Sequence, residues 1–270
     1  MREDDHPSEP PRGLDLGGAA ASRVLDALPS TALDALVAGC EESALPAGAT
    51  VGALAWGDDA LFVRSGAVRF ERAVGARHEP LAAAEAGDLV VPFGAARPPR
   101  VVTDDGATLV RVPSPALTHA RRRYPAFDRE VARAEERSTT AWLLAGCRLF
   151  APLRAAERGA LAEHAIHRRL SLGEALVRRG DQPDGVFMVL QGEIGVTDPD
   201  EPPERLAAPG CLGVMHCLGQ VAAPVDAVAR SAVEVCFFDA AALFPLLFDE
   251  LLWAAFERAS RRGYVLQRCG

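Results

Sequence analysis

The chain has 270 residues, of which 49% are hydrophobic and 24% charged, and its formal net charge at pH 7 is -8. This length favours two domains, each large enough to bury its own core. The negative charge disfavours general nucleic-acid binding, because neutralising phosphates requires a basic surface. The sequence lacks a run of about 18 uninterrupted apolar residues, the length needed to span a bilayer, so we expect a cytoplasmic protein without a membrane partner.

The six cysteines are scattered and form no CxxC pair. This spacing is not typical of a disulfide framework or a zinc ribbon, so we expect packed thiols and no metal site. Residues 1–20 are acidic and rich in Pro and Gly, and they lack the pattern of a signal peptide. We predict that they form a disordered tail.

The sequence repeats itself with an offset of about 125 residues. Residues 24–51 align without a gap on residues 149–176, and "LFVRSGAVRF" aligns farther on with "FMVLQGEIGV". Both segments read in the order helix, Gly turn, strand, Gly turn, strand. We interpret the pattern as a duplication, which predicts one domain over residues 21–145 and a second over residues 146–270.

Each repeat begins with a short amphipathic helix and continues with short strands rich in Val, Leu and Phe. Turns with Gly, Pro and Asp separate these strands, and each repeat closes with helix, over residues 115–147 and 241–263. The predicted fold class is therefore mainly β with flanking α-helices, as in a small β-roll with helical lids.

The stretch "LFAPLRAAERGALAEHAIHRRLSLGEALVRRGDQPDGVFMVLQGEIGV", which begins at Leu149, carries a family resemblance. It resembles the first half of a cyclic nucleotide-binding domain, the effector module of catabolite-activator-type regulators. The first repeat keeps the similar segment "ALTHARRRYPAF" where such domains enter their closing helices. The resemblance implies two tandem β-rolls of the jelly-roll or double-stranded β-helix type, each with N- and C-terminal helices.

In the family, the nucleotide is held by a pattern similar to Phe-Gly-Glu, followed by Pro-Arg-Ser/Thr-Ala. The Glu accepts a hydrogen bond from the ribose 2′-hydroxyl, and the Arg pairs with the cyclic phosphate. In the second repeat, Gly213 matches the family Gly, but Val214 stands in place of Glu. Val225 and Asp226 stand in place of Arg and Ser/Thr, so we expect no cAMP or cGMP binding there.

The first repeat keeps remnants of both halves of the pattern in Phe93, Gly94 and Arg100, while Ala95 replaces the Glu. Seven positions separate Phe93 from Arg100, so the helix between them would be shorter by about one turn. Arg97 and Arg100 are either solvated loop arginines or the contacts of an anion. We expect both repeats to be degenerate as nucleotide sites and to need no cofactor.

The preferred hypothesis is a non-catalytic regulatory or scaffold protein that binds an unidentified protein partner through its roll faces and closing helices. The last helix resembles the family's dimerisation helix, which leaves a homodimer open. No DNA reader is expected, because the chain ends at Gly270, a few residues beyond that helix, without a helix-turn-helix.

Two alternatives remain. The first is a sensor that binds cAMP, cGMP or another small anion through the first repeat, at Phe93, Gly94, Arg97 and Arg100. Gly213 would be the corresponding contact of the second repeat. The other is a cupin-like enzyme, which needs three convergent metal ligands. His164 and His167 lie at helical i, i+3 spacing, but they have no third ligand in view and are interpreted as a surface helix face.

Overall fold

The computed structural model describes residues 22–52, 57–74, 76–91, 99–147, 149–182, 184–199, 202–214, 222–248, 250, 253–254, 256 and 267–268. Several predictions concern residues outside these ranges: the tail (1–20), the end of the last helix, and four residues of the first cassette, namely Phe93, Gly94, Ala95 and Arg97.

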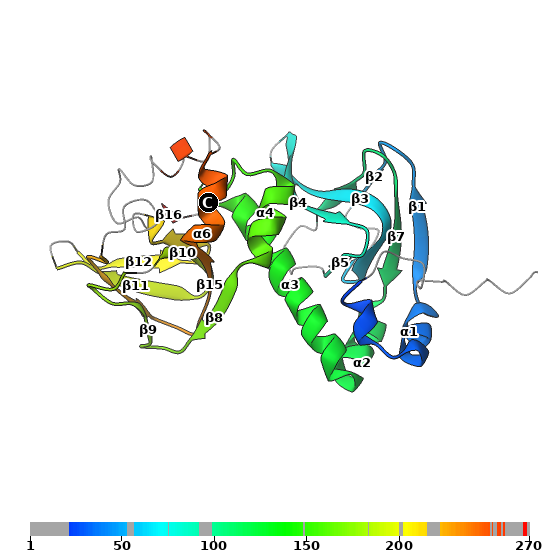
Figure 1. The fold of residues 1–270 in the computed structure, drawn as a ribbon, viewed down its shortest axis with the longest axis horizontal. Coiled ribbons are helices and arrows are strands. Elements are labelled where there is room, and N and C mark those ends of the chain that lie inside the picture. The colour runs from blue at the N-terminus through cyan, green and yellow to red at the C-terminus, as the bar shows by residue number, and fades with distance from the viewer. Residues whose placement is uncertain are drawn as a thin grey trace, which may run out of the picture. The chain divides into compact units, whose positions relative to one another are not determined.

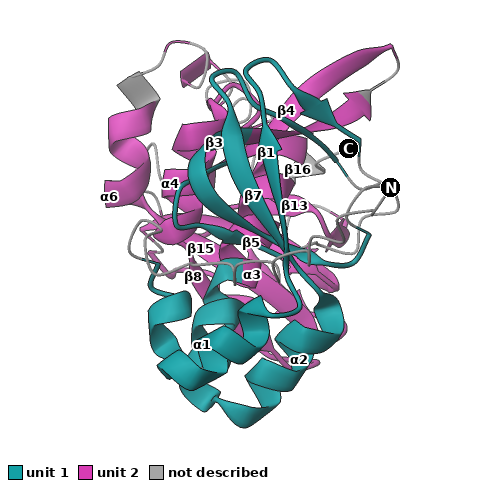
Figure 2. Cartoon of the chain, turned by 90° about the vertical axis from the view of Figure 1, so that its right-hand side faces the viewer, with its two compact units in different colours: residues 1–68, 84–134 teal, residues 69–83, 135–270 magenta. Residues whose placement is uncertain are grey.

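The chain forms two compact units (Figure 2). Unit 1 comprises Met1–Val68 and Ala84–Ala134, and unit 2 comprises Arg69–Ala83 and Glu135–Gly270. The division thus passes through two strands and one long helix. The boundary predicted from the sequence, between residues 145 and 146, falls in the last turn of that helix.

The elements that lie wholly or partly in unit 1 begin with a 3-10 turn and a short helix, continue with seven strands and end with two helices. They are η1 (Leu25–Ala27), α1 (Ser30–Val37), β1 (Glu41–Leu45), β2 (Thr50–Val51), β3 (Ala60–Val74), β4 (Arg77–Glu85), β5 (Leu89–Val90), β6 (Arg100–Val102), β7 (Ala107–Val112), α2 (Ser114–Arg123) and α3 (Pro125–Gly146).

The remaining elements, all in unit 2, follow the same order of helix, strands and helix. They are α4 (Ala155–Glu163), β8 (Ile166–Leu170), β9 (Ala175–Val177), β10 (Gly185–Gln191), β11 (Glu193–Thr197), β12 (Glu204–Ala207), β13 (Gly210–Leu212), β14 (Asp226–Ala229), β15 (Val233–Asp239), α6 (Ala240–Leu243), η3 (Phe244–Phe248) and β16 (Gln267–Arg268).

The strands of unit 2 form two sheets, with the orders β16-β13-β10-β15-β8 and β12-β11-β14-β9 (Figure 1). Their ladders are antiparallel. In any β-strand, successive side chains point to opposite faces of the sheet. In β10, Phe187 and Val189 join one buried cluster, while Val186 and Met188 join another. The five-stranded sheet is therefore buried on both faces.

The first of these clusters, called the roll interior below, is formed almost entirely by strand residues of both sheets: Leu170, Leu176, Val177, Phe187, Val189, Ile194, Val196, Leu206, Leu212, Ala223, Val225, Ala227, Ala229, Val233 and Val235. The second, called the helix-facing cluster, joins the other face of the sheet to helical and turn residues: Leu144, Cys147, Leu149, Phe150, Leu153, Leu161, Val186, Met188, Cys211, Val214, Cys236, Phe238, Ala240, Leu243 and Phe256.

The strands that lie wholly or partly in unit 1 form one sheet. Its order is β1-β7-β3-β6-β2, and β4 and β5 also pair with β3. Its helix-covered core includes Phe62 and Val110 from the strands, and Leu117, Phe127 and Val131 from α2 and α3. The predicted fold class, mainly β rolls flanked by helices, is confirmed.

The ladder register recurs along the chain. The pairing of β3 with β7 shifts between Val63 and Ser65, and the pairing of β10 with β15 shifts between Val189 and Gln191. These two irregularities are 126 positions apart in the sequence. The order of elements and the position of the bulge therefore repeat together, which is a stricter correspondence than the sequence alone reveals.

Two predicted helical segments differ from the structure. Residues 149–153 form turns, although Leu149, Phe150 and Leu153 are buried as a helix face would be. The first closing helix is broken at Tyr124, which adopts an extended conformation because Pro125 disfavours a helical residue before it. None of the described helices is long and apolar enough to cross a membrane.

Positive-φ glycines lie at the turns that the sequence predicts, including Gly173, Gly180 and Gly192. Gly192 follows β10 with φ +87°, and a Cβ there would collide with the carbonyl oxygen of Ala232. Gly66 repeats this arrangement against the carbonyl of Gly106. At both sites the backbone conformation and the close approach of the next strand require glycine.

Substituting Gly192 by Ala is expected to lower the free energy of unfolding by about 3 kcal/mol or more, because left-handed strain is added to a backbone clash. Gly173→Ala is the matched control: φ is +84°, but nothing lies within 4 Å of the added Cβ. Strain alone predicts a loss of about 1–2 kcal/mol there. Equal losses in urea unfolding of the two variants would contradict the role of the close approach.

Candidate functional site

The second-repeat cassette begins where β13 ends. Gly213 has φ +95°, and Val214 follows it. The structure resumes its description at Ala222, and β14 begins at Asp226. The family resemblance assigns ribose binding to position 214 and phosphate binding to position 225. Both positions therefore lie within the described residues, on either side of residues 215–221.

Val214 and Val225 are buried, with exposed fractions of 0% and 1%. Val214 belongs to the helix-facing cluster, whereas Val225 belongs to the roll interior. The two side chains pack into different cores and bring no charge to either. A ring phosphate placed beside them would lose its water shell without gaining an ionic partner, which costs several kcal/mol.

The Arg178–Asp181 turn closes the cassette through its backbone. The amide of Gly180 donates to the carbonyl of Ala223 at 2.8 Å, and the amide of Ala223 donates to the carbonyl of Asp181 at 2.7 Å. The amide of Arg179 donates to Oδ1 of Asp226 at 3.0 Å. The carboxylate that replaces the family Ser/Thr thus holds this turn.

The same turn is also stabilised by its own aspartate. Oδ2 of Asp181 accepts a hydrogen bond of 2.7 Å from the amide of Arg178. The side chains of Arg178 and Arg179 are exposed. The Arg-Arg-Gly-Asp sequence therefore builds the turn with its backbone and Asp181, and its two cations remain at the surface.

Two arginines bracket the cassette in the sequence, Arg205 and Arg230, and both lie on the outer side of β11. The side chain of Arg230 covers Gly195, where a Cβ would collide with it. Arg205 is the cross-strand partner of Gly195 and forms an ion pair with Glu193, at 3.6 Å. Because Ile194 fills the roll interior, Gly195 and its two covering arginines face the other way.

In the first repeat, strand pairing fixes which residues correspond to this cassette. Leu61 of β3 pairs with Val90, and Phe187 of β10 pairs with Leu212. The repeated ladder makes Leu61 equivalent to Phe187, so Val90 is equivalent to Leu212.

Counting on from that pair, Val91 matches Gly213, and the next residue in the sequence, Pro92, matches Val214. The Phe-Gly dipeptide favours a different match, with Ala95, three residues farther along. The structure describes neither Pro92 nor Ala95, so the residue at the Glu position stays a prediction. Both alignments place a residue without a carboxylate at the Glu position.

The strand after the cassette is fixed in the same way. Thr50 pairs with Val102, and Ala175 pairs with Val228. Thr50 and Ala175 are separated by the repeat offset of 125 residues, so Val102 is equivalent to Val228.

Arg100 therefore matches Asp226, and Pro99 matches Val225. Pro99 and Val101 are buried, while Arg100 between them is half-buried. A strand alternates its faces, so a shift of one residue turns the side chain to the opposite side. Arg100 lies on the other face of β6 from the position that the family resemblance gives to the phosphate-binding arginine.

The predicted histidine pair does not lie on one helix. Helix α4 ends at Glu163, so His164 is its C-cap and His167 lies in β8. Nδ1 of His164 is 2.9 Å from the carbonyl oxygen of Ala160, and Nε2 of His167 is 3.2 Å from Oγ1 of Thr140. Among the residues that the structure describes, no three potential ligands are placed to hold a metal ion.

Three cysteines are buried in the helix-facing cluster, namely Cys147, Cys211 and Cys236. The sulfur atoms of Cys147 and Cys211 are 3.4 Å apart, and none of the three cysteines forms a disulfide bond. Burial raises the pKa of the Cys236 thiol well above its ordinary value. Cys236 is therefore a packed, protonated side chain.

A comparison with protein families gives a match within the second repeat. The family model described as "Cyclic nucleotide-binding domain" matches residues 167–250. No curated protein sequence matches the chain.

Solved structures resemble most of the chain at low identity. The regulatory domain of Toxoplasma gondii PKA with cAMP is 18% identical, with 89% of this chain and 93% of that chain covered and a TM-score of 0.44. The regulatory subunit of a cAMP-independent protein kinase A from Trypanosoma brucei is 14% identical, with 89% and 88% covered and a TM-score of 0.43. The sensor domain of the transcriptional regulator DNR from Pseudomonas aeruginosa is 19% identical, with 44% and 85% covered and a TM-score of 0.40. Similarity this low assigns neither ligand nor partner. The family match itself shows one cyclic nucleotide-binding domain in the chain, within its second half.

Proposed function

We propose that the protein is a non-catalytic regulatory or scaffold protein whose two repeats are both cyclic nucleotide-binding-type rolls that have lost nucleotide binding. It acts by binding another protein. The observation that carries the proposal is the burial of Val214 and Val225 in two separate apolar cores, at the positions where the family places its carboxylate and its arginine.

The size of the loss can be judged from the missing contacts. Hydrogen bonds to charged groups contribute roughly 1.5–3 kcal/mol each, and the second repeat lacks both the sugar contact and the phosphate contact. Each 1.4 kcal/mol is a factor of ten in affinity, so losing both contacts lowers affinity by several orders of magnitude. The first repeat lacks the carboxylate under either alignment, and its Arg100 lies on the outer side of its strand.

The roll of unit 2 also supports a role without ligand through its packing. Val225 and Ala227 are 1% and 0% exposed, and they pack with Phe187 and Val189 in the roll interior. These side chains bury one another. The fold can thus be stable as an interaction module with no bound molecule.

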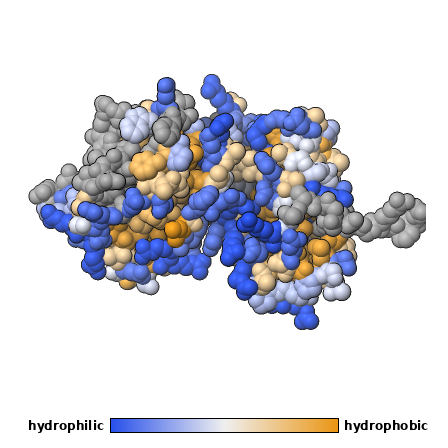
Figure 3. All heavy atoms as spheres, in the orientation of Figure 1, coloured by the Kyte–Doolittle hydropathy of each residue, from blue (hydrophilic) through white to orange (hydrophobic). Residues whose placement is uncertain are grey.

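The exposed surface indicates where a partner would bind. All of the large hydrophobic side chains exposed in the described residues belong to unit 2: Ile166 is 55% exposed, Leu172 73%, Phe244 46% and Trp253 48%. Figure 3 shows hydrophobic residues at the surface between charged ones. Phe244 and Trp253 follow β15, in the closing helical segment. Exposed aromatic side chains are typical anchors of protein interfaces.

Ion pairs connect strands in both units, as Arg205 and Glu193 do in unit 2. Arg111 of β7 pairs with Glu41 of β1 at 2.8 Å, and Arg64 of β3 pairs with Glu42 at 2.5 Å. Exposed pairs of this kind contribute little to stability, but they keep an edge hydrated. Because the exposed aromatic side chains Phe244 and Trp253 lie there, we place the partner-binding surface on the closing segment of unit 2.

Calorimetric titration of the full chain with cAMP and with cGMP is expected to give no binding tighter than about 1 mM, which corresponds to about -4.1 kcal/mol. Micromolar binding that disappears in Arg100→Ala would instead support a sensor that uses the first repeat. Arg169→Ala is the matched control, since Arg169 is another strand arginine, paired with Glu234 at 2.7 Å and distant in sequence from either cassette.

The partner surface is tested by affinity capture from the native cell, with quantitative mass spectrometry of the captured proteins. The double variant Phe244→Ser with Trp253→Ser is expected to lower the recovery of the specific partner about tenfold, as removal of interface aromatic anchors does. Leu172→Ser removes a more exposed apolar side chain from a turn of the roll and is expected to leave recovery unchanged. A loss confined to Leu172→Ser would move the partner site to the roll.

A further inference from the structure

Arg158 of α4 is the one charged residue that is buried among those the structure describes, with an exposed fraction of 2%. Its nearest neighbours in sequence on the helix are exposed or half-buried. Long cationic side chains normally keep their charged end in water, so a buried guanidinium must be satisfied by specific partners.

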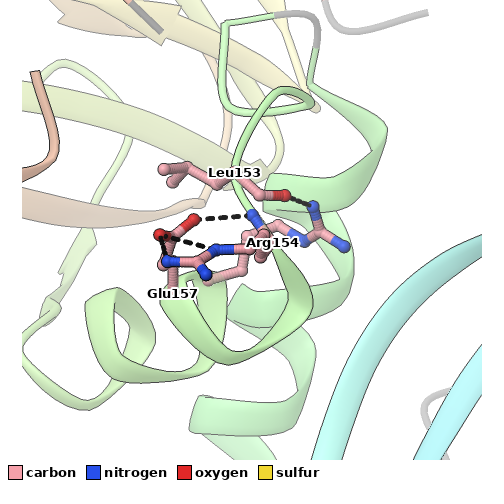
Figure 4. Close-up of polar contacts among 4 residues, drawn as sticks. Leu153, Arg154 and Glu157 are labelled. Carbon is pink, nitrogen blue, oxygen red and sulfur yellow. Dashed lines mark hydrogen bonds and ion pairs between the residues drawn. The ribbon is translucent and has the colours of Figure 1, made fainter. Parts of the chain in front are cut away.

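The partners of Arg158 are backbone carbonyl groups. Nε donates to the carbonyl of Leu81 at 3.2 Å, and Nη2 donates to the carbonyl of Pro80 at 2.7 Å. Nη1 donates to the carbonyl of Leu153, just before α4, and Figure 4 shows this carbonyl oxygen in a hydrogen bond. Arg158 thus joins its own helix to β4 through carbonyl groups. Burial lowers the pKa of its guanidinium below the ordinary value, but arginine remains protonated in proteins.

Residues 69–83, called the arm below, consist of the end of β3 and the start of β4. The arm belongs to unit 2, although both strands continue in unit 1. The ring of Phe70 lies 6.1 Å from that of Trp142 in α3, and Nη1 of Arg72 lies beside Gly146. Leu81 is 6% exposed. Apolar packing and the Arg158 hydrogen bonds therefore hold the arm against α3 and α4.

We propose that Arg158 is a positioning residue that fixes the arm to α4 and thereby makes the β3 ladder of unit 1 and the helix-facing cluster of unit 2 one cooperative block. This inference is independent of the proposed function, because it requires neither ligand nor partner. It assigns the arm a regulatory role: a change that shifts β3 in one unit alters the stability of the other.

The mechanism follows from the strands themselves. β3 pairs with β7 from Ala60 to Gly66 and reaches Arg158's helix through the arm, so the ladder and the arm share one continuous backbone. Strand register is specified in whole residues, because a one-residue slip moves every side chain to the wrong face. The arm therefore stays attached only while the ladder keeps its register. The coupling is reciprocal, as for any two linked equilibria.

The experiment compares the full chain with Arg158→Met by hydrogen exchange. The amides of residues 77–83 are expected to exchange at least about tenfold faster in the variant, because three carbonyls lose their charged donor. Arg154→Met is the matched control: Arg154 lies one turn earlier, is 82% exposed at its side chain and pairs with Glu157 at the surface (Figure 4). Its exchange over residues 77–83 should stay within about twofold of the wild type.

Cooperativity is measured by exchange in increasing urea, with peptides from β7 reporting on unit 1 and peptides from β10 reporting on unit 2. The wild type should unfold with coincident midpoints, and Arg158→Met with separated midpoints, which simple destabilisation would not produce. Arg158→Lys, which keeps the charge but not the planar donor set, replaces the Met variant under the same criteria where that variant does not fold. Unchanged arm exchange, separated midpoints in the wild type, or coincident midpoints in the variant would each overturn the proposal.

Discussion

The burial of β10 on both faces is the constraint on which the rest of unit 2 depends. Phe187 and Val189 must fill the roll interior, while Val186 and Met188 must meet helical side chains. A shift of one residue would exchange these two sets, which differ in size and in neighbours. The turn at Gly192 and the pairing with β15 therefore have one acceptable register, and the positions of the cassette residues follow from it.

This constraint explains why the cassette residues of the second repeat are apolar. Val214 and Val225 lie at places where the two cores meet the cassette, and each contributes to one of them. A side chain there is either a ligand contact or part of the packing, since a buried charge without its ligand is strongly destabilising. We propose that these positions serve packing in this chain, and that its function depends on the surface and not on the pocket.

The sequence predicts the fold class and the Gly- and Asp-containing turns between strands, because these depend on local conformation and on the period of the apolar residues. The sequence aligns the first cassette on the Phe93-Gly94 dipeptide, three residues from the alignment that strand pairing favours. It also misses Arg158, which reads as an ordinary helix-surface arginine. Cross-strand register and tertiary carbonyl partners are properties of the folded chain, and neither has a local signature.

Arg158 and the missing cassette arginine differ in where their partners come from. A phosphate-binding arginine inside a roll is satisfied only while the ligand is bound, so the empty state carries the cost of a buried cation. Arg158 is satisfied by carbonyls of Pro80, Leu81 and Leu153, which the folded chain always supplies. A module that works without ligand can retain a buried charge of the second kind but not of the first. The one buried charge among the described residues is thus one whose partners belong to the chain itself.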